Sequence, residues 1–340
     1  MQTKRNRVGV IGAGNWGKQV VRTFHALGAL GAVGEADTAL HPALGAQYPG
    51  IPLYADHRDL LKEPVPAVVI ATPVSTHYAI AREALLAGKD VLVEKPITMS
   101  VAEAADLVAL ARDRGRILMV GHLLLFQPAV QWLKAYLDKG ALGRVFTLYQ
   151  ERLNLGRARA VENALWSLGV HDVAVLLYLM GQPPCRVQAT GQRILQPDIE
   201  DDVYLHMHFP GGTKAHLHTS WLWPEKRRRL VVLGSEGMLI YDESDRSVTL
   251  HRKRVTPDLQ SRDDGSEIVF QGSGQPLTLE AVHFLAGVHA HTASPLIDGT
   301  QGLEVVRVLE LGSRCLAAET DRKEGQEDAR PTPGSDPAVP

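Results

Sequence analysis

Short apolar runs alternate with amphipathic stretches through the first third of the chain. Apolar runs cover residues 7–11, 67–71, 91–93 and 116–121, and turn-forming residues separate them from stretches such as residues 18–27. Short apolar runs bounded by turn signals are typical of buried strands, whereas the longer stretches have the spacing of helices. Alternating strands and helices predict a parallel, doubly wound sheet of the α/β class.

The pattern changes after Gly121, where strand-like runs become predominant. Strands are expected at residues 145–153, 187–194, 203–209, 214–221, 230–233 and 238–241, and helices at residues 127–139, 162–180, 279–291 and 300–317. The turn sequence at residues 209–213 joins the third and fourth of these strands into a hairpin. The second part is therefore expected to be α+β, with a large, mostly antiparallel sheet and helices on one face.

A glycine-rich turn lies between the first strand and the first helix. It consists of Gly12, Ala13, Gly14, Asn15, Trp16 and Gly17. In this context Gly12 permits a tight turn, Gly14 lets the backbone approach a pyrophosphate, and Gly17 lets the helix pack close to the strand. The free amides at the start of the helix favour phosphate groups. The turn therefore predicts a dinucleotide site.

Glu35 follows the apolar segment at residues 30–34. Dinucleotide-binding folds place an acidic residue about 20 residues after the glycines, where it binds the ribose hydroxyls. A carboxylate at this position would repel a 2′-phosphate. We therefore expect NAD as the cofactor, in preference to NADP.

Lys95 lies at the end of the buried run at residues 91–93, and Pro96 biases it away from helical geometry. Ligands of open α/β sheets lie beyond the carboxyl ends of the strands, so Lys95 is expected to project into the cofactor crevice. A partly buried lysine shifts its pKa readily and can act as a proton shuttle. Further along, Ser100 is expected to cap the next helix, with Glu103 in the capping-box position.

Composition indicates a soluble globular protein of two domains. The 340 residues are 45% hydrophobic and 22% charged, and the net charge of −2 gives no general attraction to nucleic acid or anionic membranes. Cys185 and Cys315 are too few for a disulfide framework, which suits a reducing cytoplasm. Residues 1–9 lack the core of a signal peptide, and no apolar run reaches the roughly 18 residues of a membrane helix.

These observations divide the chain into three parts. We expect a dinucleotide-binding domain at residues 1–121, a substrate-binding and oligomerisation domain at residues 122–318, and a disordered tail at residues 319–340. The tail is rich in charge, proline and glycine, a composition that buries too little apolar surface to order the chain.

Four histidines flank the predicted hairpin turn. They are His206, His208, His216 and His218. Neutral imidazole is a common zinc ligand, and residues two apart in a strand share a face. All four share a face if His208 pairs with His216, whereas a two-residue loop sets His208 opposite Ala215 and the two pairs on opposite faces. We expect the second arrangement and no metal site.

A set of residues in the first domain resembles the signature of the Gfo/Idh/MocA family of sugar-type oxidoreductases. The matching positions are residues 71–73, His77, residues 84–85, 87–89 and 91–96, and the similarity extends from about Val8 to Ala317. The resemblance implies that Thr72, Pro73, His77 and Glu94 lie along the cofactor. It also implies that Lys95 faces both the nicotinamide and the substrate.

The second part resembles a narrower branch of this family that acts on nucleotide-linked sugars. The matching segments are residues 121–122, 126–129, 151–156, 163–172 and 220–222, with Pro224 and Lys226. In this branch His171 would be the active-site histidine, and either Lys95 or His171 would remove the hydroxyl proton while the other holds the substrate. Ser167 replaces an Asp found in many relatives, so either it orients the histidine more weakly or the lysine carries more of the acid–base work. Ala174 replaces an Asp common in inositol-dehydrogenase-like members and argues against that substrate class.

The resemblance implies NAD-dependent oxidation of C3 of UDP-N-acetylglucosamine. The 3-keto product would pass to an aminotransferase that forms a 2,3-diamino sugar for lipid A or surface polysaccharide. The residues expected at the substrate are His122, Arg152, Asn154, Asn163, Trp166, Ser167, Asp172, Lys226 and Arg228. The basic cluster at residues 226–229 could equally be a diphosphate site or a solvated face.

Other substrates and one other class of protein fit the same residues. The alternatives are the uronic-acid form of the nucleotide sugar, a free aldose, a cyclitol, or a non-catalytic NAD-binding regulator. We expect a homodimer or homotetramer formed through the exposed face of the second sheet, because a large uncovered apolar sheet face is unusual in a monomer. No nucleic-acid or membrane partner is expected.

Overall fold

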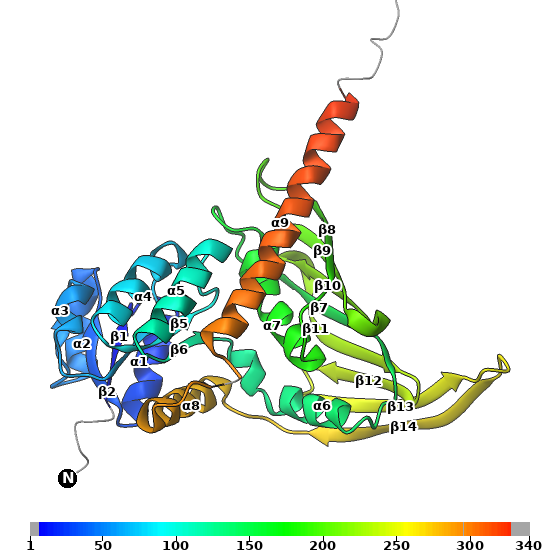
Figure 1. The fold of residues 1–340 in the computed structure, drawn as a ribbon, viewed down its shortest axis with the longest axis horizontal. Helices are drawn as coiled ribbons and strands as arrows, with labels where there is room; N and C mark the ends of the chain where they lie inside the picture. The colour runs from blue at the N-terminus through cyan, green and yellow to red at the C-terminus, as the bar shows by residue number, and fades with distance from the viewer. Residues whose placement is uncertain (1–6, 295, 328–340) are drawn as a thin grey trace, which may run out of the picture.

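The computed structural model describes residues 7–294 and 296–327, which form two sheets, the first with helices on both faces and the second with helices on one face (Figure 1). The first sheet has six parallel strands in the order β3-β2-β1-β4-β5-β6. They are β1 Val8–Ile11, β2 Leu30–Gly34, β3 Leu53–Tyr54, β4 Ala67–Ile70, β5 Asp90–Glu94 and β6 Leu118–Gly121. The predicted doubly wound parallel sheet is confirmed.

Five helices of the first part connect these strands. They are α1 Gly17–Ala26, α2 His41–Gln47, α3 His57–Leu61, α4 His77–Leu86 and α5 Val101–Asp113. At the start of α5, Ser100 has extended backbone geometry but makes no side-chain cap, contrary to the predicted capping box. Glu310, far along the chain, instead accepts a hydrogen bond from the Val101 amide at 2.9 Å.

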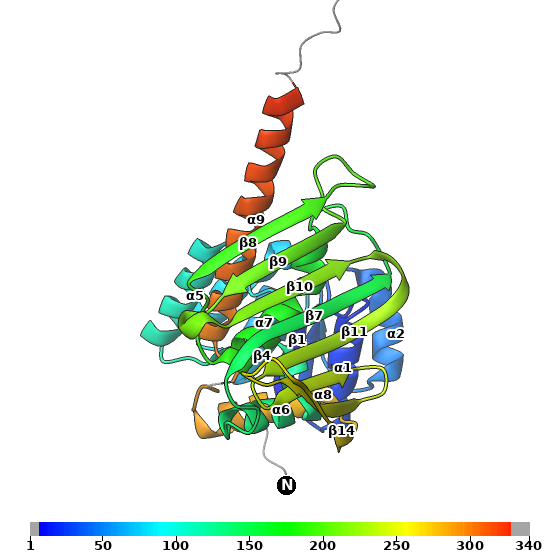
Figure 2. The ribbon, with the colours of Figure 1, turned by 90° about the vertical axis from the view of Figure 1, so that its right-hand side faces the viewer.

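The second sheet has eight strands in the order β14-β13-β12-β11-β7-β10-β9-β8. They are β7 Val145–Leu155, β8 Arg186–Gln192, β9 Asp202–His208, β10 Lys214–Ser220, β11 Leu222–Gly234, β12 Gly237–Asp242, β13 Ser247–Val255 and β14 Ser261–Gln271. Only the β7–β10 pair is parallel. Helices α6 (Pro128–Asp138), α7 (Val170–Met180) and α9 (Gly299–Glu327) cover one face, and the other face is open (Figure 2).

Two strands of the second sheet, β13 and β14, were not predicted from the pattern of apolar residues. β13 and β14 form a projecting hairpin whose outer part is exposed, so charge pairs replace apolar contacts. One such pair joins Lys253 to Asp263 at 2.8 Å, and another joins Arg252 to Glu267 at 2.6 Å. β11 also begins well before its predicted start, because its polar residues pair along β7.

The chain returns to the first sheet at its C-terminal end. Helix α8 (Pro276–Ala290) packs against α1 and the short 3-10 turn Leu123–Phe126 that follows β6. Helix α9 begins against β6 and α5 and then passes α7 and β8. It continues to Glu327, inside the segment predicted as a disordered tail, because residues 316–327 are rich in good helix formers. Residues 328–340 of that predicted tail lie outside the described residues.

The hairpin register differs from the predicted one. Residue His208 pairs with Lys214, and His206 pairs with His216, because the connection spans residues 209–213 and not two residues. All four histidines therefore share the open face of the sheet, and the prediction of opposite faces is wrong. His206 and His216 approach to 2.7 Å between their Nδ1 atoms, yet no cluster of three or more metal-ligating side chains is found in the described part of the chain.

Within residues 7–294 and 296–327, none of the helices combines the length and apolar character needed to span a bilayer.

Candidate active site

The glycine turn has the geometry that a dinucleotide requires. Gly12 has φ of +93°, and a Cβ there would lie 2.7 Å from the Ala71 carbonyl oxygen. A Cβ on Gly17 would lie 2.1 Å from the Gly12 carbonyl oxygen, so this glycine permits the close packing of helix on turn. Gly14 has no atom within 4 Å of its Cβ position, which leaves open space above the turn. These features fit a pyrophosphate beside the start of α1.

Glu35 is held at the edge of the glycine turn. Its carboxylate accepts hydrogen bonds from the Ala13 amide at 2.6 Å and from the Asp37 amide at 2.9 Å. His41 lies 2.8 Å from the Glu35 carbonyl oxygen. The carboxylate therefore stands at the carboxyl end of β2, where it fits the ribose hydroxyls of NAD.

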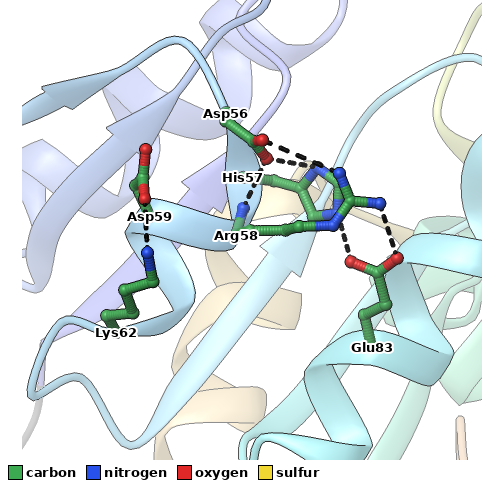
Figure 3. Close-up of polar contacts among 6 residues, drawn as sticks. All are labelled: Asp56, His57, Arg58, Asp59, Lys62 and Glu83. Carbon is green, nitrogen blue, oxygen red and sulfur yellow. Dashed lines mark hydrogen bonds and ion pairs between the residues drawn. The ribbon is translucent and has the colours of Figure 1, made fainter.

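An ion cluster braces the helices beside this edge of the sheet (Figure 3). His57 and Arg58 of α3 both contact Glu83 of α4 at 2.9 Å, and Asp56 accepts a hydrogen bond from the Arg58 amide. The His57 backbone also packs beside Gly34, the last residue of β2. Exposed pairs of this kind contribute about 1 kcal/mol or less each, so the cluster chiefly fixes the position of α3 near Glu35.

His77 lies between the two loops expected to hold the cofactor, and its predicted place along the cofactor stays a prediction. Its ring bridges the carbonyl oxygens of Pro96 at 2.8 Å and Thr72 at 2.9 Å, and it is 1% exposed. Burial lowers the pKa of His77. The ring ties the loop that carries Thr72 and Pro73 to the loop that carries Lys95.

Glu94 is buried beneath the glycine turn. Its carboxylate accepts hydrogen bonds from the Trp16 indole at 2.5 Å and from the Lys95 amide at 3.3 Å. Gly121, at the end of the neighbouring strand, leaves room for it, because a Cβ there would lie 3.0 Å from Glu94 Oε2. Glu94 thus connects β5 to the turn through Trp16.

Lys95, His122 and His171 converge between the two sheets. The Lys95 ammonium donates to the Ser167 carbonyl oxygen at 3.4 Å across the two parts of the chain. Ser167 belongs to a π-helical turn, Leu165–Gly169, which directly precedes α7 and its His171. Such turns are frequent at functional sites because they re-aim the residues that follow. Nδ1 of His171 and both ring nitrogens of His122 have no hydrogen-bond partner among the described residues.

Burial shifts the titration of all three groups. It lowers the pKa of Lys95, and together with the Lys95 charge it lowers the pKa of His122 to about 3. Burial, then the charges of Lys95 and Arg152, hold the pKa of His171 well below its ordinary value. The two imidazoles are therefore neutral at pH 7, while the lysine moves toward the range where it can exchange a proton.

Arg152, Asp172 and Arg228 form an ion network beside α7, and their predicted contacts with the substrate stay predictions. Arg152 makes two bonds to Asp172, at 2.5 and 2.9 Å, and both side chains are buried. Glu243 joins the network at 3.7 Å from Arg152 and 3.2 Å from Arg228. Successive helix residues are about 100° apart, so Asp172 faces the sheet when His171 faces the cleft.

Asn163 and Trp166 also support the helix, and their predicted substrate contacts stay predictions. The Asn163 side chain donates to Glu200 at 2.7 Å and accepts from the Trp166 amide at 3.2 Å. The Trp166 indole donates to Ser313 of α9 at 2.8 Å. Asn154 is partly buried on β7, and Lys226 is exposed on β11, so their substrate contacts stay predictions.

Two acidic residues of this region were missed from the sequence. Glu243 follows a strand in a polar stretch, where nothing in the sequence distinguishes it from a solvated surface residue. Glu280 could have been found from the sequence, because it lies beside an apolar stripe of α8 formed by Leu277, Ala281 and Phe284. A glutamate next to such a stripe is a candidate for a buried, functional carboxyl group.

The family of the chain follows from comparison with known proteins. Residues 6–122 match the model of an oxidoreductase family with an NAD-binding Rossmann fold, and residues 130–240 match the GFO/IDH/MocA C-terminal domain. The chain belongs to the Gfo/Idh/MocA family of oxidoreductases. NAD is accordingly the cofactor of its first domain, as the glycine turn and Glu35 predict.

Two comparisons point to the same relative. The chain is 30% identical over 308 residues to UDP-N-acetylglucosamine 3-dehydrogenase of Acidithiobacillus ferrooxidans, covering 88% of this chain and 94% of the relative. A solved structure of that enzyme, GnnA, aligns with a TM-score of 0.81 at 29% identity, over 92% of this chain and 98% of the other. Inositol 2-dehydrogenase 2 of Saccharopolyspora erythraea is 32% identical, but over 60% of this chain and 63% of that protein.

Proposed function

We propose that the protein is an NAD-dependent sugar dehydrogenase that oxidises C3 of UDP-N-acetylglucosamine. The observation that carries this proposal is the convergence of Lys95, His122 and His171 beside the dinucleotide turn. The similarity to UDP-N-acetylglucosamine 3-dehydrogenase extends over 88% of the chain and 94% of that relative. It therefore supports a nucleotide sugar as the substrate over a free cyclitol, because the inositol dehydrogenase aligns over a smaller share of this chain.

Lys95 acts as the general base in this proposal, and His171 holds the reacting hydroxyl. A base works best when its pKa lies near the working pH. Burial moves the pKa of Lys95 downward toward that range, whereas it moves the pKa of His171 further below it. Neutral His171 and His122 then offer ring nitrogens as hydrogen-bond partners for the sugar. Bound NAD supplies the hydride acceptor.

The first experiment follows NADH absorbance after NAD and UDP-N-acetylglucosamine are mixed with the protein. We expect a rise with this substrate alone, and none with the corresponding uronic acid or with free inositol. Lys95→Ala should lower kcat by about 10²-fold or more, since general-base groups contribute roughly 10²–10⁴-fold. Turnover with inositol alone would contradict the nucleotide-sugar assignment. Binding of NAD without turnover of any sugar would favour a regulator.

A pH profile tests the assignment of the base. The activity of the wild-type enzyme should rise with pH as Lys95 loses its proton, with a midpoint below the ordinary lysine value of about 10.4. His171→Asn should weaken substrate binding and keep that midpoint. If His171→Asn removes the pH dependence and Lys95→Arg keeps it, the two roles are reversed.

The proposed place in metabolism follows from the product. A 3-keto nucleotide sugar is the substrate that an aminotransferase requires to install a 3-amino group, which supports a role in making 2,3-diamino sugars for lipid A or surface polysaccharide. We further propose a cytoplasmic homodimer or homotetramer that associates through the open face of the second sheet. Exposed Tyr204 and Leu233 lie on that face and support this arrangement.

A further inference from the structure

Glu280 is a buried carboxyl group with an unusual lack of partners. It lies on α8, is 1% exposed, and its Oε1 atom has no hydrogen-bond partner among the described residues. No arginine or lysine forms an ion pair with it in the part of the chain that the structure describes. A buried carboxylate without a partner is strongly disfavoured, so the neutral acid is the stable form.

The elements around Glu280 place it beside the cofactor turn. Helix α8 packs against α1, which begins directly after Trp16, and against the turn that follows His122. The indole of Trp16 in turn donates to Glu94. His283, on the same side of α8, bonds Ser294 and packs edge-on against Phe126.

Two carboxyl groups therefore share one dry region, and their environments differ. Burial raises the pKa of Glu94, but two hydrogen bonds and the positive charge of Lys95 oppose that shift and favour its ionised form, whereas Glu280 has no such partners among the described residues. Burial, and then the charge of Glu94, raise the pKa of Glu280 well above its ordinary value. When two buried carboxyl groups interact, one proton is retained by the pair.

We propose that Glu280 is a positioning residue that stays protonated at neutral pH and, with ionised Glu94, keeps a single negative charge beneath the glycine turn of the cofactor site. Glu280 adds no charge to the site. When Lys95 is neutral and able to act as the base, the charge of Glu94 is uncompensated and favours the cationic ring of NAD⁺ over the neutral ring of NADH, which suits the oxidative direction. The cofactor part of this inference rests on the proposed function.

Infrared spectroscopy of the full chain tests the protonation directly. We expect the carbonyl band of a protonated carboxylic acid across about pH 6 to 8, where ordinary glutamates are ionised. Glu280→Gln should remove this band, and Glu225→Gln, a substitution at an exposed site, should leave it. In Glu94→Gln the band should disappear at a lower pH than in the wild type, because the neighbouring charge that raises the pKa of Glu280 is gone.

Cofactor affinities test the consequence. Because glutamine resembles the neutral acid, Glu280→Gln should keep the ratio of the NAD⁺ and NADH dissociation constants within about threefold, whereas Glu94→Gln should shift it toward NADH by about tenfold, or 1.4 kcal/mol. Absence of the infrared band, or a tenfold change in the ratio for Glu280→Gln, would overturn the inference. Failure of every sugar to react while the band persists would instead sink the proposed function.

Discussion

Lys95 controls the titration of the histidine that faces it. Its charge is the second cause, after burial, of the lowered pKa of His171. Lys95→Met should therefore raise the pKa of His171, although burial keeps it below about 6.5. A pH titration of the His171 ring protons by NMR measures this shift without any need for activity. Lys18→Met, at an exposed position, is the control, and an unchanged His171 pKa in Lys95→Met would contradict the arrangement.

Gly14 and Gly17 of the glycine turn should have different roles, Gly14 in NAD binding and Gly17 in stability. Gly14 has open space at its Cβ position, so Gly14→Ala should leave Tm without NAD nearly unchanged and weaken NAD binding, because the methyl group occupies the approach to the pyrophosphate. Gly17→Ala should lower Tm itself, because its Cβ would lie 2.1 Å from the Gly12 carbonyl oxygen. Thermal melts with and without NAD distinguish the two. Equal loss of Tm without NAD in both variants would contradict this division.

At the scale of elements, the start of α5 depends on α9 and not on its own cap. Glu310→Ala should cost about 0.5–2 kcal/mol of unfolding free energy, the range typical of a lost helix cap, and Ser100→Ala should cost less. The Val101 amide holds the pKa of Glu310 below its ordinary value, so this stabilisation is present above about pH 4.3 and is lost as pH falls through the lowered pKa.

Urea denaturation at two pH values checks this prediction. Glu304→Ala is the matched control, because Glu304 lies on the same helix and makes only a surface ion pair with Arg307. A larger cost for Ser100→Ala than for Glu310→Ala would restore the predicted capping box.

Removing one member of the Arg152–Asp172–Glu243 ion network should lower the free energy of unfolding substantially. Asp172→Asn removes the closer of the two carboxylates that pair with buried Arg152 and leaves only Glu243 at 3.7 Å, so we expect a loss of about 3–5 kcal/mol. The double variant Arg152→Met with Asp172→Leu should lose less, because no buried charge is left behind. A double-mutant cycle by urea denaturation measures the coupling, and additive effects of the two substitutions would contradict it.

Elements with a strong apolar or glycine signal could be predicted from the sequence, and those held by polar contacts could not. The strands beside Gly12 and Lys95 are buried, so their patterns reveal them. β13 and β14 have a short apolar pattern at their inner part, where Val248 and Leu250 are buried, and charge pairs hold the exposed outer part. At the site, the type of residue at Lys95 and His171 was informative. The partners of Asp172 and Trp166 depend on which helix face meets the sheet, which one sequence does not specify.

At the scale of the whole molecule, the open sheet face should mediate self-association. Light scattering with size-exclusion chromatography should give a multiple of the 37.1 kDa chain mass. Leu233→Lys, at a position 41% exposed on that face, should shift the protein toward the monomer. Leu311→Lys, on α9 away from the face, should not. A monomeric wild type would contradict the proposed oligomer.

Helices α8 and α9 pack against the first sheet although they are the last to be translated, which affects co-translational folding. During synthesis the N-terminal sheet leaves the ribosome first. The helix that covers β6 and satisfies the Val101 amide begins only at Gly299, after the whole second sheet has been translated. The nucleotide-binding half must therefore wait for the last part of the chain before it is complete, and a nascent chain arrested before α8 should bind NAD poorly even though every residue of the glycine turn has already emerged.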